Sequence, residues 1–373
     1  MKKTIFFSFL AVLLSTLAMA QTPHSHALGR KIIFPDVPGF KTLKCDFHIH
    51  TVFSDGNVWP TIRVEEALKD GLDAIALTEH LEYQPHSADI PHPDRNRSFA
   101  IATDFAKNND LLVIHGVEIT RSMPPGHSNA LFVKDANKIN VEDPMAAFRA
   151  AKEQGAFVFW NHPNWISQRP DGIVTLTDMH KTLIKEGLLH GIEVVNDLTY
   201  SDEALQVALE NDLTVMGTSD IHGLVDWQFD IPQGGHRPIA LVFAKEKTEA
   251  SIKEALFAGR TVAWFNNLLS GKEDYLNPLI YSSLKVGKLT YSGKSQVAEI
   301  EIENLSDANF ILENLSPYTF HAHGDVLELK AHSTTTLEVK TVTRLESVEL
   351  TFRVLNALLA PKKHPVISLM VKG

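Results

Sequence analysis

Residues 44–51 read KCDFHIHT, an apolar segment that ends in two histidines, His48 and His50. In an extended strand successive side chains alternate between two faces, so residues two apart project the same way and can bind one cation together. The same arrangement recurs at Asp220 and His222, which follow a second strand-like run. The two pairs predict a metal site at the ends of two strands.

Between these pairs lie five more residues with metal-binding side chains, each in or just behind a short strand-like segment: Asp55, His80, Glu118, His127 and His162. A single histidine at a strand end more often hydrogen-bonds a neighbouring loop than binds a metal. Nine such residues together predict a multinuclear site. Imidazoles and carboxylates without thiolates suit Zn²⁺, Mn²⁺ or Fe, whereas Ca²⁺ and Mg²⁺ sites use mainly oxygen ligands.

Strand-like and helical patterns alternate over the same part of the chain. Apolar runs typical of strands cover residues 73–78, 111–114, 129–133, 156–160, 191–195 and 239–243. These runs are apolar on both faces, as expected for parallel strands covered by helices. Helical patterns cover 62–69, 144–154, 201–211 and 249–258, and glycine ends three of them. Repeated strand-helix units predict a closed or nearly closed barrel, with its chemistry at the carboxyl ends of the strands.

Taken in order, the motifs resemble the series of the PHP family of metal-dependent phosphoesterases. The resemblance covers roughly residues 44–265 and rests on His48-x-His50, SDG at 54–56, TEH at 78–80, GVE at 116–118, HSN at 127–129, NHP at 161–163 and Asp220-x-His222. It implies a distorted (β/α)7 barrel and three divalent transition-metal ions, Zn, Mn or Fe. Many relatives carry histidine at the position of Asp55, where this chain departs from the pattern.

The resemblance also implies how the ligands divide among the metals. The first metal would be held by His48, His50, Glu118 and Asp220, the second by Asp55, His80 and His222, and the third by His127 and His162, with Glu118 bridging. A hydroxide between two metals would attack the phosphorus, so no protein nucleophile is needed. Asp220 and His222 are therefore predicted to be catalytic as ligands.

Other residues are candidates for the remaining chemistry. The leaving group needs a proton, which loop residues Tyr83, His86 and His236 could supply, although loop histidines are usually just solvated. Arg121 and Arg237, and more weakly Arg169, are predicted to bind the substrate phosphate, because arginine can donate two parallel hydrogen bonds to it. The alternative is that each arginine only bridges loops.

The predicted reaction is metal-dependent hydrolysis of small phosphodiesters in a trinuclear site. One alternative is a phosphomonoesterase, similar to histidinol-phosphate phosphatases or nucleotide phosphatases, and another is a non-catalytic metal-binding module. No nucleic acid polymer is expected as a partner, because the formal net charge is −10 and no basic stripe with interleaved aromatic residues occurs. The oligomeric state stays open.

The C-terminal region has a different pattern. Residues 298–303 and 348–354 alternate apolar and polar side chains, as strands with one solvated face do. We predict a small all-β, sandwich-like domain over residues 271–373, after a barrel over residues 41–270. His321-x-His323 repeats the histidine spacing there, but no carboxylate cluster or ordered series of strands supports a metal site, so we predict a solvated strand face.

The N-terminus looks like a signal peptide. Residues 1–20 begin with two lysines, continue with an apolar run and end in Ala-Met-Ala, which predicts cleavage near Ala20/Gln21 and export to the periplasm or the medium, with no membrane anchor. Residues 21–40 form an N-terminal lead-in. The single cysteine, Cys45, excludes an internal disulfide and is predicted to be a buried apolar side chain.

Overall fold

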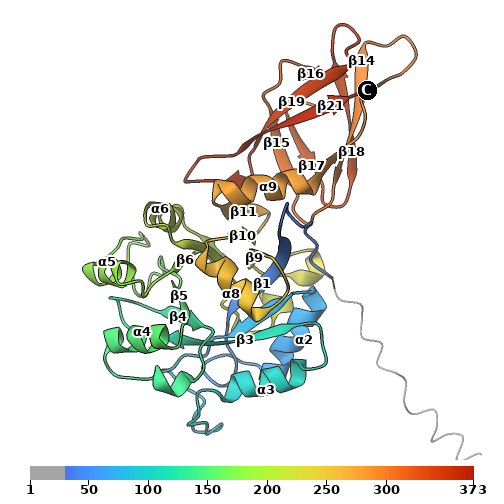
Figure 1. Cartoon of the computed structure of the whole chain (residues 1–373). Helices are drawn as coiled ribbons and strands as arrows, with labels where there is room; N and C mark the ends of the chain where they lie inside the picture. The colour runs from blue at the N-terminus through green and yellow to red at the C-terminus, as the bar shows by residue number, and fades with distance from the viewer. Residues whose placement is uncertain (1–29) are drawn as a thin grey trace, which may run out of the picture. The chain divides into compact units, whose positions relative to one another are not determined.

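The computed structural model describes residues 30–373, and residues 31–373 form one compact unit (Figure 1). The predicted signal peptide and the first part of the lead-in, residues 21–29, lie outside the described residues. The rest of the lead-in packs on the folded unit. Ile32 and Phe34 are buried, and the Ile32 amide donates to the Asp70 carbonyl at 2.8 Å.

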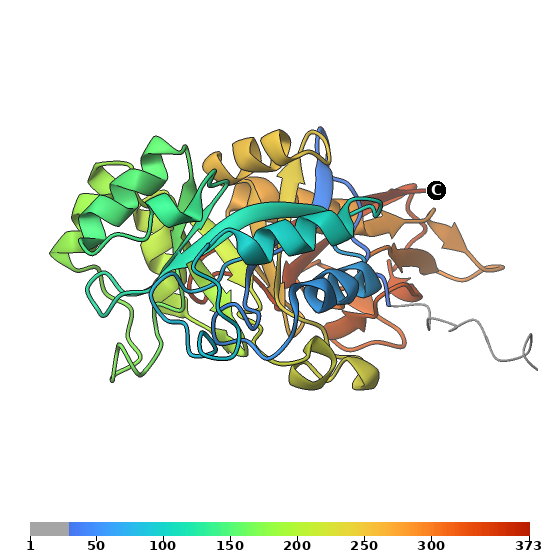
Figure 2. The ribbon, with the colours of Figure 1, turned by 90° about the horizontal axis from the view of Figure 1, so that it is seen from below.

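A curled 12-stranded sheet with helices against it forms the N-terminal region (Figures 1 and 2). Its order is β20-β11-β10-β9-β1-β2-β3-β4-β5-β6-β7, with β8 also paired to β6. The strands are β1 (Lys41–Ile49), β2 (Ala74–Leu77), β3 (Leu112–Ile119), β4 (Ser128–Leu131), β5 (Phe157–Trp160), β6 (Gly191–Asn196), β7 (Thr199–Tyr200), β8 (Thr214–Thr218), β9 (Ile239–Ala244), β10 (Thr261–Phe265), β11 (Leu268–Gly271) and β20 (Ala357–Leu358).

The carboxyl ends of β1 and β8 lie side by side. Ile49 and Ile221 form a parallel bridge, and the His50 amide donates to the Ile221 carbonyl at 3.1 Å. The two sequence pairs, His48-x-His50 and Asp220-x-His222, are therefore neighbours in space. The predicted architecture, a sheet covered by helices followed by an all-β region, is present.

Two of the predicted parallel strands run antiparallel. β4 is antiparallel to both β3 and β5, and β9 is antiparallel to β1. The connection from β3 to β4, residues 120–127, contains no helix, so the chain turns back directly beside the strand it has just left. Apolar runs predict burial on both faces but do not encode direction.

The four predicted helices are present, with ends close to the predicted ones. They are α2 (Pro60–Asp70), α4 (Pro144–Glu153), α6 (Asp202–Glu210) and α8 (Glu249–Phe257), and α2 ends at Gly71 in the left-handed conformation, φ 70°. Sequence reasoning missed α3 (Arg97–Ala106), α5 (Asp178–Lys185), the short α7 (Val225–Gln228) and α9 (Glu273–Ser283), and the short 3-10 turns η1 (Ala136–Lys138) and η2 (Ile231–Gln233). Among residues 30–373, no helix has the length and apolarity that crossing a membrane requires.

The C-terminal region consists of two packed antiparallel sheets. One contains β12 (Leu284–Val286), β13 (Thr290–Tyr291), β14 (Val297–Asn304), β16 (Thr319–Phe320) and β18 (Thr334–Lys340), and the other β15 (Phe310–Asn314), β17 (Val326–Leu329), β19 (Ser347–Val354) and β21 (Val366–Lys372). Burial alternates along β14, β19 and β21, as the sequence predicted. His321 and His323 lie in a bend after β16 and not in a strand.

Asn356 joins the two regions. Its Nδ2 donates to the carbonyls of Asn267 and Asn309, each at 2.7 Å, and its Oδ1 accepts from the Ile311 amide at 2.9 Å. Asn267 lies in the turn between β10 and β11, and β20 pairs with β11 directly behind it. This asparagine-centred junction is one of the links between the barrel sheet and the C-terminal region, which also share a buried hydrophobic core.

Candidate metal centre

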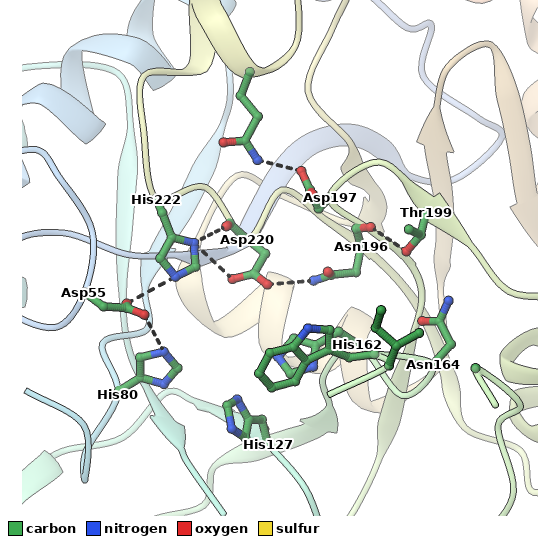
Figure 3. A pocket seen from close by; sticks show the side chains of 14 residues that line it. Asp55, His80, His127, His162, Asn164, Asn196, Asp197, Thr199, Asp220 and His222 are labelled. Carbon is green, nitrogen blue, oxygen red and sulfur yellow. Dashed lines mark hydrogen bonds and ion pairs between the residues drawn. The ribbon is translucent and has the colours of Figure 1, made fainter. Parts of the chain in front are cut away.

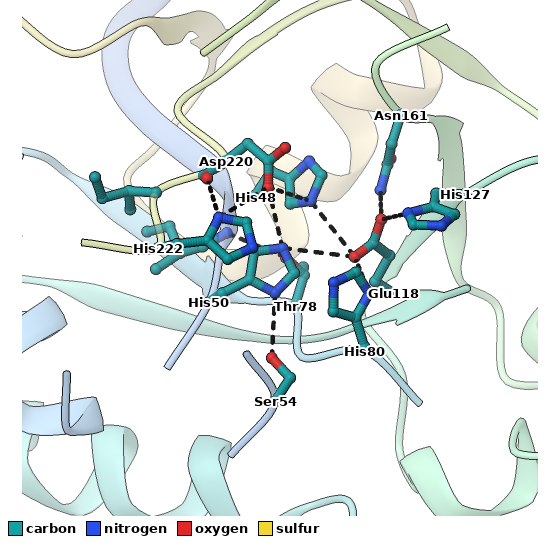
Figure 4. A network of polar contacts seen from close by, with 12 residues as sticks. His48, His50, Ser54, Thr78, His80, Glu118, His127, Asn161, Asp220 and His222 are labelled. Atoms are coloured by element: carbon teal, nitrogen blue, oxygen red, sulfur yellow. Dashed lines mark hydrogen bonds and ion pairs between the residues drawn. The ribbon is translucent and has the colours of Figure 1, made fainter. Parts of the chain in front are cut away.

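All nine predicted ligands lie in one cluster at the strand ends (Figures 3 and 4). His48 lies near the end of β1 and His50 directly follows it, Glu118 lies near the end of β3, and His127 directly precedes β4. The others follow β1, β2, β5 and β8 in loops: Asp55, His80, His162, Asp220 and His222.

The loop that carries Asp55 passes directly over β1. A Cβ at Gly56 would lie 2.7 Å from backbone atoms of His50 and Thr51, so only glycine permits this approach. Two other ligands, His162 and Asp220, have positive φ values of 27° and 50°. Such backbone conformations are uncommon for residues with a side chain and cluster at functional sites.

The cluster contains four groups whose potential ligand atoms lie within 4.8 Å of one another. They are His50, Asp55, His80 and His222; His48, His50 and Asp220; His48, Glu118 and His162; and His80, Glu118 and His127. Asp55, His80 and His222 fall together as the resemblance implied. The set implied for the first metal is divided between two groups, and His127 and His162 lie in different groups that share Glu118.

Glu118 lies at the centre of the cluster. It is fully buried, and its carboxylate oxygens lie 2.6 Å from His80 Nδ1, 2.9 Å from His127 Nδ1 and 3.6 Å from His162 Nε2. Asp220 has a similar place at the other side, with Oδ1 3.1 Å from Nε2 of both His48 and His50 (Figure 4). A carboxylate with imidazoles around both oxygens is suited to bridge two cations.

Several of these polar atoms make no hydrogen bond of acceptable geometry with any described residue, although they are buried. They are His48 Nε2, His50 Nε2, Asp55 Oδ1, Glu118 Oε2, His162 Nδ1 and Asp220 Oδ1. Buried polar atoms without partners are costly, so several at one point need an explanation. Divalent metal ions coordinated by these nitrogen and oxygen atoms provide one, and the donor set fits transition metals.

Hydrogen bonds behind the ligands orient the imidazoles. His48 Nδ1 lies 2.7 Å from Glu193 Oε1, so this nitrogen donates and Nε2 is left as an acceptor facing the cluster. Ser54 Oγ donates to Glu79 at 2.5 Å and therefore accepts from His50 Nδ1 at 3.2 Å. Such outer partners fix the tautomer and raise the basicity of metal ligands.

Burial and the charges within the cluster shift the pKa values of its side chains. Although burial acts in the opposite direction, His80 and His127 hold the pKa of Glu118 well below its usual range. Burial, together with His222 and His80, lowers the pKa of His50 to about 3. Against the effect of burial, Glu118 and Asp55 raise the pKa of His80 to about 10. His50 is therefore ready to bind a cation at neutral pH, whereas His80 must first lose a proton.

Sequence reasoning missed the buried residues that support the ligands. Glu193 in β6 contacts His48 and accepts from Thr218 Oγ1 at 2.6 Å and from the His162 amide at 2.5 Å. Asn161 Nδ2 donates to Glu118 at 2.8 Å. The available signal for Glu193 was its place as the one acidic residue in the otherwise apolar run 191–195.

Arg237 does not lie where a substrate could reach it. Its side chain is 0% exposed, with Nε 2.8 Å from Asp70 and Nη1 3.3 Å from Asp46. The expectation that Arg237 binds phosphate is therefore wrong, because its charge is already neutralised in the core. His236 is not at the cluster either: its ring stacks on Trp264 with centroids 3.6 Å apart.

The other predicted residues lie nearer the surface. Arg169 donates to Thr175, and Arg121 pairs with Glu82 at 2.8 Å and donates to the Val141 carbonyl. Neither these arginines nor His86 lines the pocket over the cluster, although Arg121 lines a neighbouring one. Their predicted roles stay predictions.

The pocket over the cluster has a volume of about 580 Å³ (Figure 3). Six of the candidate ligands reach it, and the other lining residues are Asn164, Trp165, Ile166, Gly172, Asn196, Asp197, Thr199 and Gln228. A second pocket of about 500 Å³ shares His127 and Trp165 with it and is lined also by Thr120, Arg121, Ser122, Met123, Ser167 and Gln168. The candidate ligands are thus accessible to a small molecule.

Comparison with known proteins gives three similarities. A two-domain protein from Bacteroides vulgatus that contains a predicted PHP-like metal-dependent phosphoesterase is 41% identical, covers 93% of this chain and 100% of its own, and superposes with a TM-score of 0.87. Residues 284–370 match a family model described as an Ig-like domain. An uncharacterized protein of Methanocaldococcus jannaschii is 36% identical over 85 residues, 22% of this chain, so the chain spans only 36% of the length of that curated relative.

Proposed function

This chain belongs to the PHP-like metal-dependent phosphoesterases, and from that premise we propose that it hydrolyses small phosphodiesters at a trinuclear metal centre. The observation that carries the proposal is the convergence of nine imidazole and carboxylate side chains in one cluster, six of which line the pocket. Several of their candidate ligand atoms are buried without a hydrogen bond of acceptable geometry. Three ions, Zn²⁺, Mn²⁺ or Fe, suit nine ligands when a carboxylate is shared. Elemental analysis of the purified protein is expected to give close to three such ions per chain, and fewer than two would contradict the trinuclear site.

Each group of residues has a defined part in the proposed reaction. Bound divalent metals supply an activated water near neutral pH and neutralise the phosphoryl oxygens. Asp220 and His222, which line the pocket, would hold ions there, and the fully buried Glu118 would link two of the candidate groups. Glu193 keeps His48 in the tautomer that a cation needs.

Asp197 is the best-placed residue to protonate a leaving group. It lines the pocket without being a candidate ligand, and Gln228 Nε2 holds its Oδ1 at 2.6 Å. Burial raises the pKa of Asp197. Asp197→Asn should slow cleavage of an alkyl ester more than cleavage of a nitrophenyl ester, whose leaving group needs no proton. Equal effects on both esters would exclude this role.

The charge of the pocket supports diesters over monoesters. None of the lining residues is lysine or arginine, so only bound metals would neutralise a phosphate. A diester carries one negative charge against two on a monoester, and its second organic group fits within a volume typical of ligand pockets. We expect the metal-loaded protein to cleave bis(4-nitrophenyl) phosphate faster than 4-nitrophenyl phosphate. If the monoester is cleaved tenfold faster or more, the phosphatase alternative replaces the diesterase.

We also propose that the protein acts outside the cytoplasm on small molecules, with no nucleic acid polymer or membrane as partner. The support is the signal-like sequence of residues 1–20 and the net charge of −10, which becomes more negative when the two lysines of that segment are removed. N-terminal sequencing of the exported protein should start at Gln21. A protein found uncleaved in the cytoplasm would contradict this proposal.

A further inference from the structure

A large aromatic side chain stands exposed beside the metal ligands. Trp165 is 43% exposed and lines both pockets over the cluster. Its ring centroid lies 5.2 Å from that of His162 and 5.6 Å from that of His127. Ile166, 69% exposed, lines the same pocket. Exposed apolar side chains gathered at a pocket mark a ligand-binding surface more often than an accident of folding.

Backbone hydrogen bonds hold the main chain of Trp165 beside His162. The Trp165 amide donates to the His162 carbonyl at 2.9 Å, and the amides of Gln168 and Arg169 donate to the Trp165 carbonyl at 3.0 and 2.8 Å. A tight turn therefore begins at one candidate ligand, His162, and places Trp165 three residues later. The indole ring is therefore within reach of an organic group carried by a phosphoester at the candidate ligands.

The residues that line the pocket also limit the charge of the organic group that a substrate can carry. The pocket contains no lysine or arginine, and Asp197 is its one acidic residue outside the candidate ligands. A second anionic group on the substrate would therefore meet no fixed cation there. An uncharged group has no such penalty.

We propose that Trp165 determines substrate specificity by stacking on a flat, uncharged aromatic group carried next to the phosphoester. The substrate class is thus aryl phosphoesters or nucleoside esters with a single phosphate, which share this chemistry. The inference rests on the proposed phosphoesterase function. It concerns which organic group the site selects and not the hydrolysis itself.

Binding of non-hydrolysable phosphonates tests the stacking directly. Calorimetric titration of the metal-loaded protein should give a Kd for phenylphosphonate at least tenfold below that for methylphosphonate, as aromatic stacking commonly gives. Trp165→Leu, which keeps apolar bulk without a ring, should reduce this ratio to about one, whereas Trp165→Phe should keep most of it. Trp59→Ala is the matched control, because Trp59 is also 43% exposed and lines neither pocket.

The possible outcomes test the role of Trp165 separately from the proposed phosphoesterase activity. An unchanged ratio in Trp165→Leu overturns the inference. A tenfold preference for phenylphosphonate that Trp165→Leu abolishes supports aryl phosphoesters as substrates. A larger Trp165-dependent gain for the non-hydrolysable phosphonate analogue of adenosine 5'-monophosphate supports nucleoside esters. Failure of the wild-type protein to hydrolyse any ester would refute the proposed function, and the phosphonate ratios would still decide the role of Trp165.

Discussion

Single buried residues decide whether the imidazoles can act as metal ligands. Glu193 is 1% exposed and contacts His48, Thr218, Asn196 and the amide of His162 at once. One carboxylate therefore sets the tautomer of one candidate ligand and the backbone position of another. Such outer contacts are worth about 10- to 100-fold in metal affinity in other metal sites.

Glu193→Gln should leave the protein folded and weaken metal binding by about 10- to 100-fold, because an amide accepts less strongly from His48 Nδ1 and cannot satisfy all four donors. Competition with a chelating dye measures the affinity. Glu249→Gln, an exposed change at the start of α8, is the control and should have no effect. Equal affinities in the two variants would remove Glu193 from the site.

Arg237→Ala should affect stability and not substrate binding. It removes the positive charge between Asp46 and Asp70 and leaves two buried carboxylates unpaired, at a cost of about 3–5 kcal/mol in the free energy of unfolding. Urea denaturation measures the loss. A variant that is as stable as the wild type but has a raised KM would restore the role in phosphate binding that the structure excludes.

The nine candidate ligands were predictable because their residue types and their places behind strands are both visible in the sequence. The supporting residues were not, since nothing local shows that Glu193 faces His48, 145 positions away. The prediction for Arg237 was wrong for the same reason, because nothing in the loop sequence shows that the side chain points inward to Asp46.

At the scale of elements, apolar pattern and glycine stops located the strands and the helices α2, α4, α6 and α8. The directions of β4 and β9 were predicted wrongly, because a fully buried strand has the same composition whether it is parallel or antiparallel to its neighbours. α9 contains Pro278 and was absorbed into the predicted β domain. Proline inside a helix contradicts the usual sequence signal.

The junction between β11 and β20 is the element whose loss should uncouple the two regions. Asn356→Ala removes three hydrogen bonds to Asn267, Asn309 and Ile311, and leaves buried backbone groups unpaired. We expect a loss of about 2–4 kcal/mol and a broader or two-step thermal transition by calorimetry. Asn108→Ala, at an exposed asparagine after α3, is the control. A single transition at the wild-type temperature would show that the junction contributes little.

At the scale of the whole molecule, buried histidines outside the cluster make stability depend on pH. Burial lowers the pKa values of His115, His180 and His190 to about 4 each, below the unfolded value of about 6.5. In that window the unfolded chain binds more protons, so the free energy of unfolding should fall as pH drops from about 6.5 to about 4. His115→Gln should reduce the slope of urea midpoint against pH, whereas the exposed His321→Gln should not. Identical slopes would contradict the burial effect.

The central claim is that the clustered side chains hold the metals that carry out phosphoester hydrolysis. Its most direct test is the rate of bis(4-nitrophenyl) phosphate cleavage by chelator-stripped protein, before and after Mn²⁺ or Zn²⁺ is restored. We expect no turnover in the stripped protein and recovery when metal returns. We expect no recovery in folded Asp220→Asn, which alters a candidate metal ligand in contact with His48 and His50. Full turnover without metal, or full recovery in Asp220→Asn, would contradict the claim.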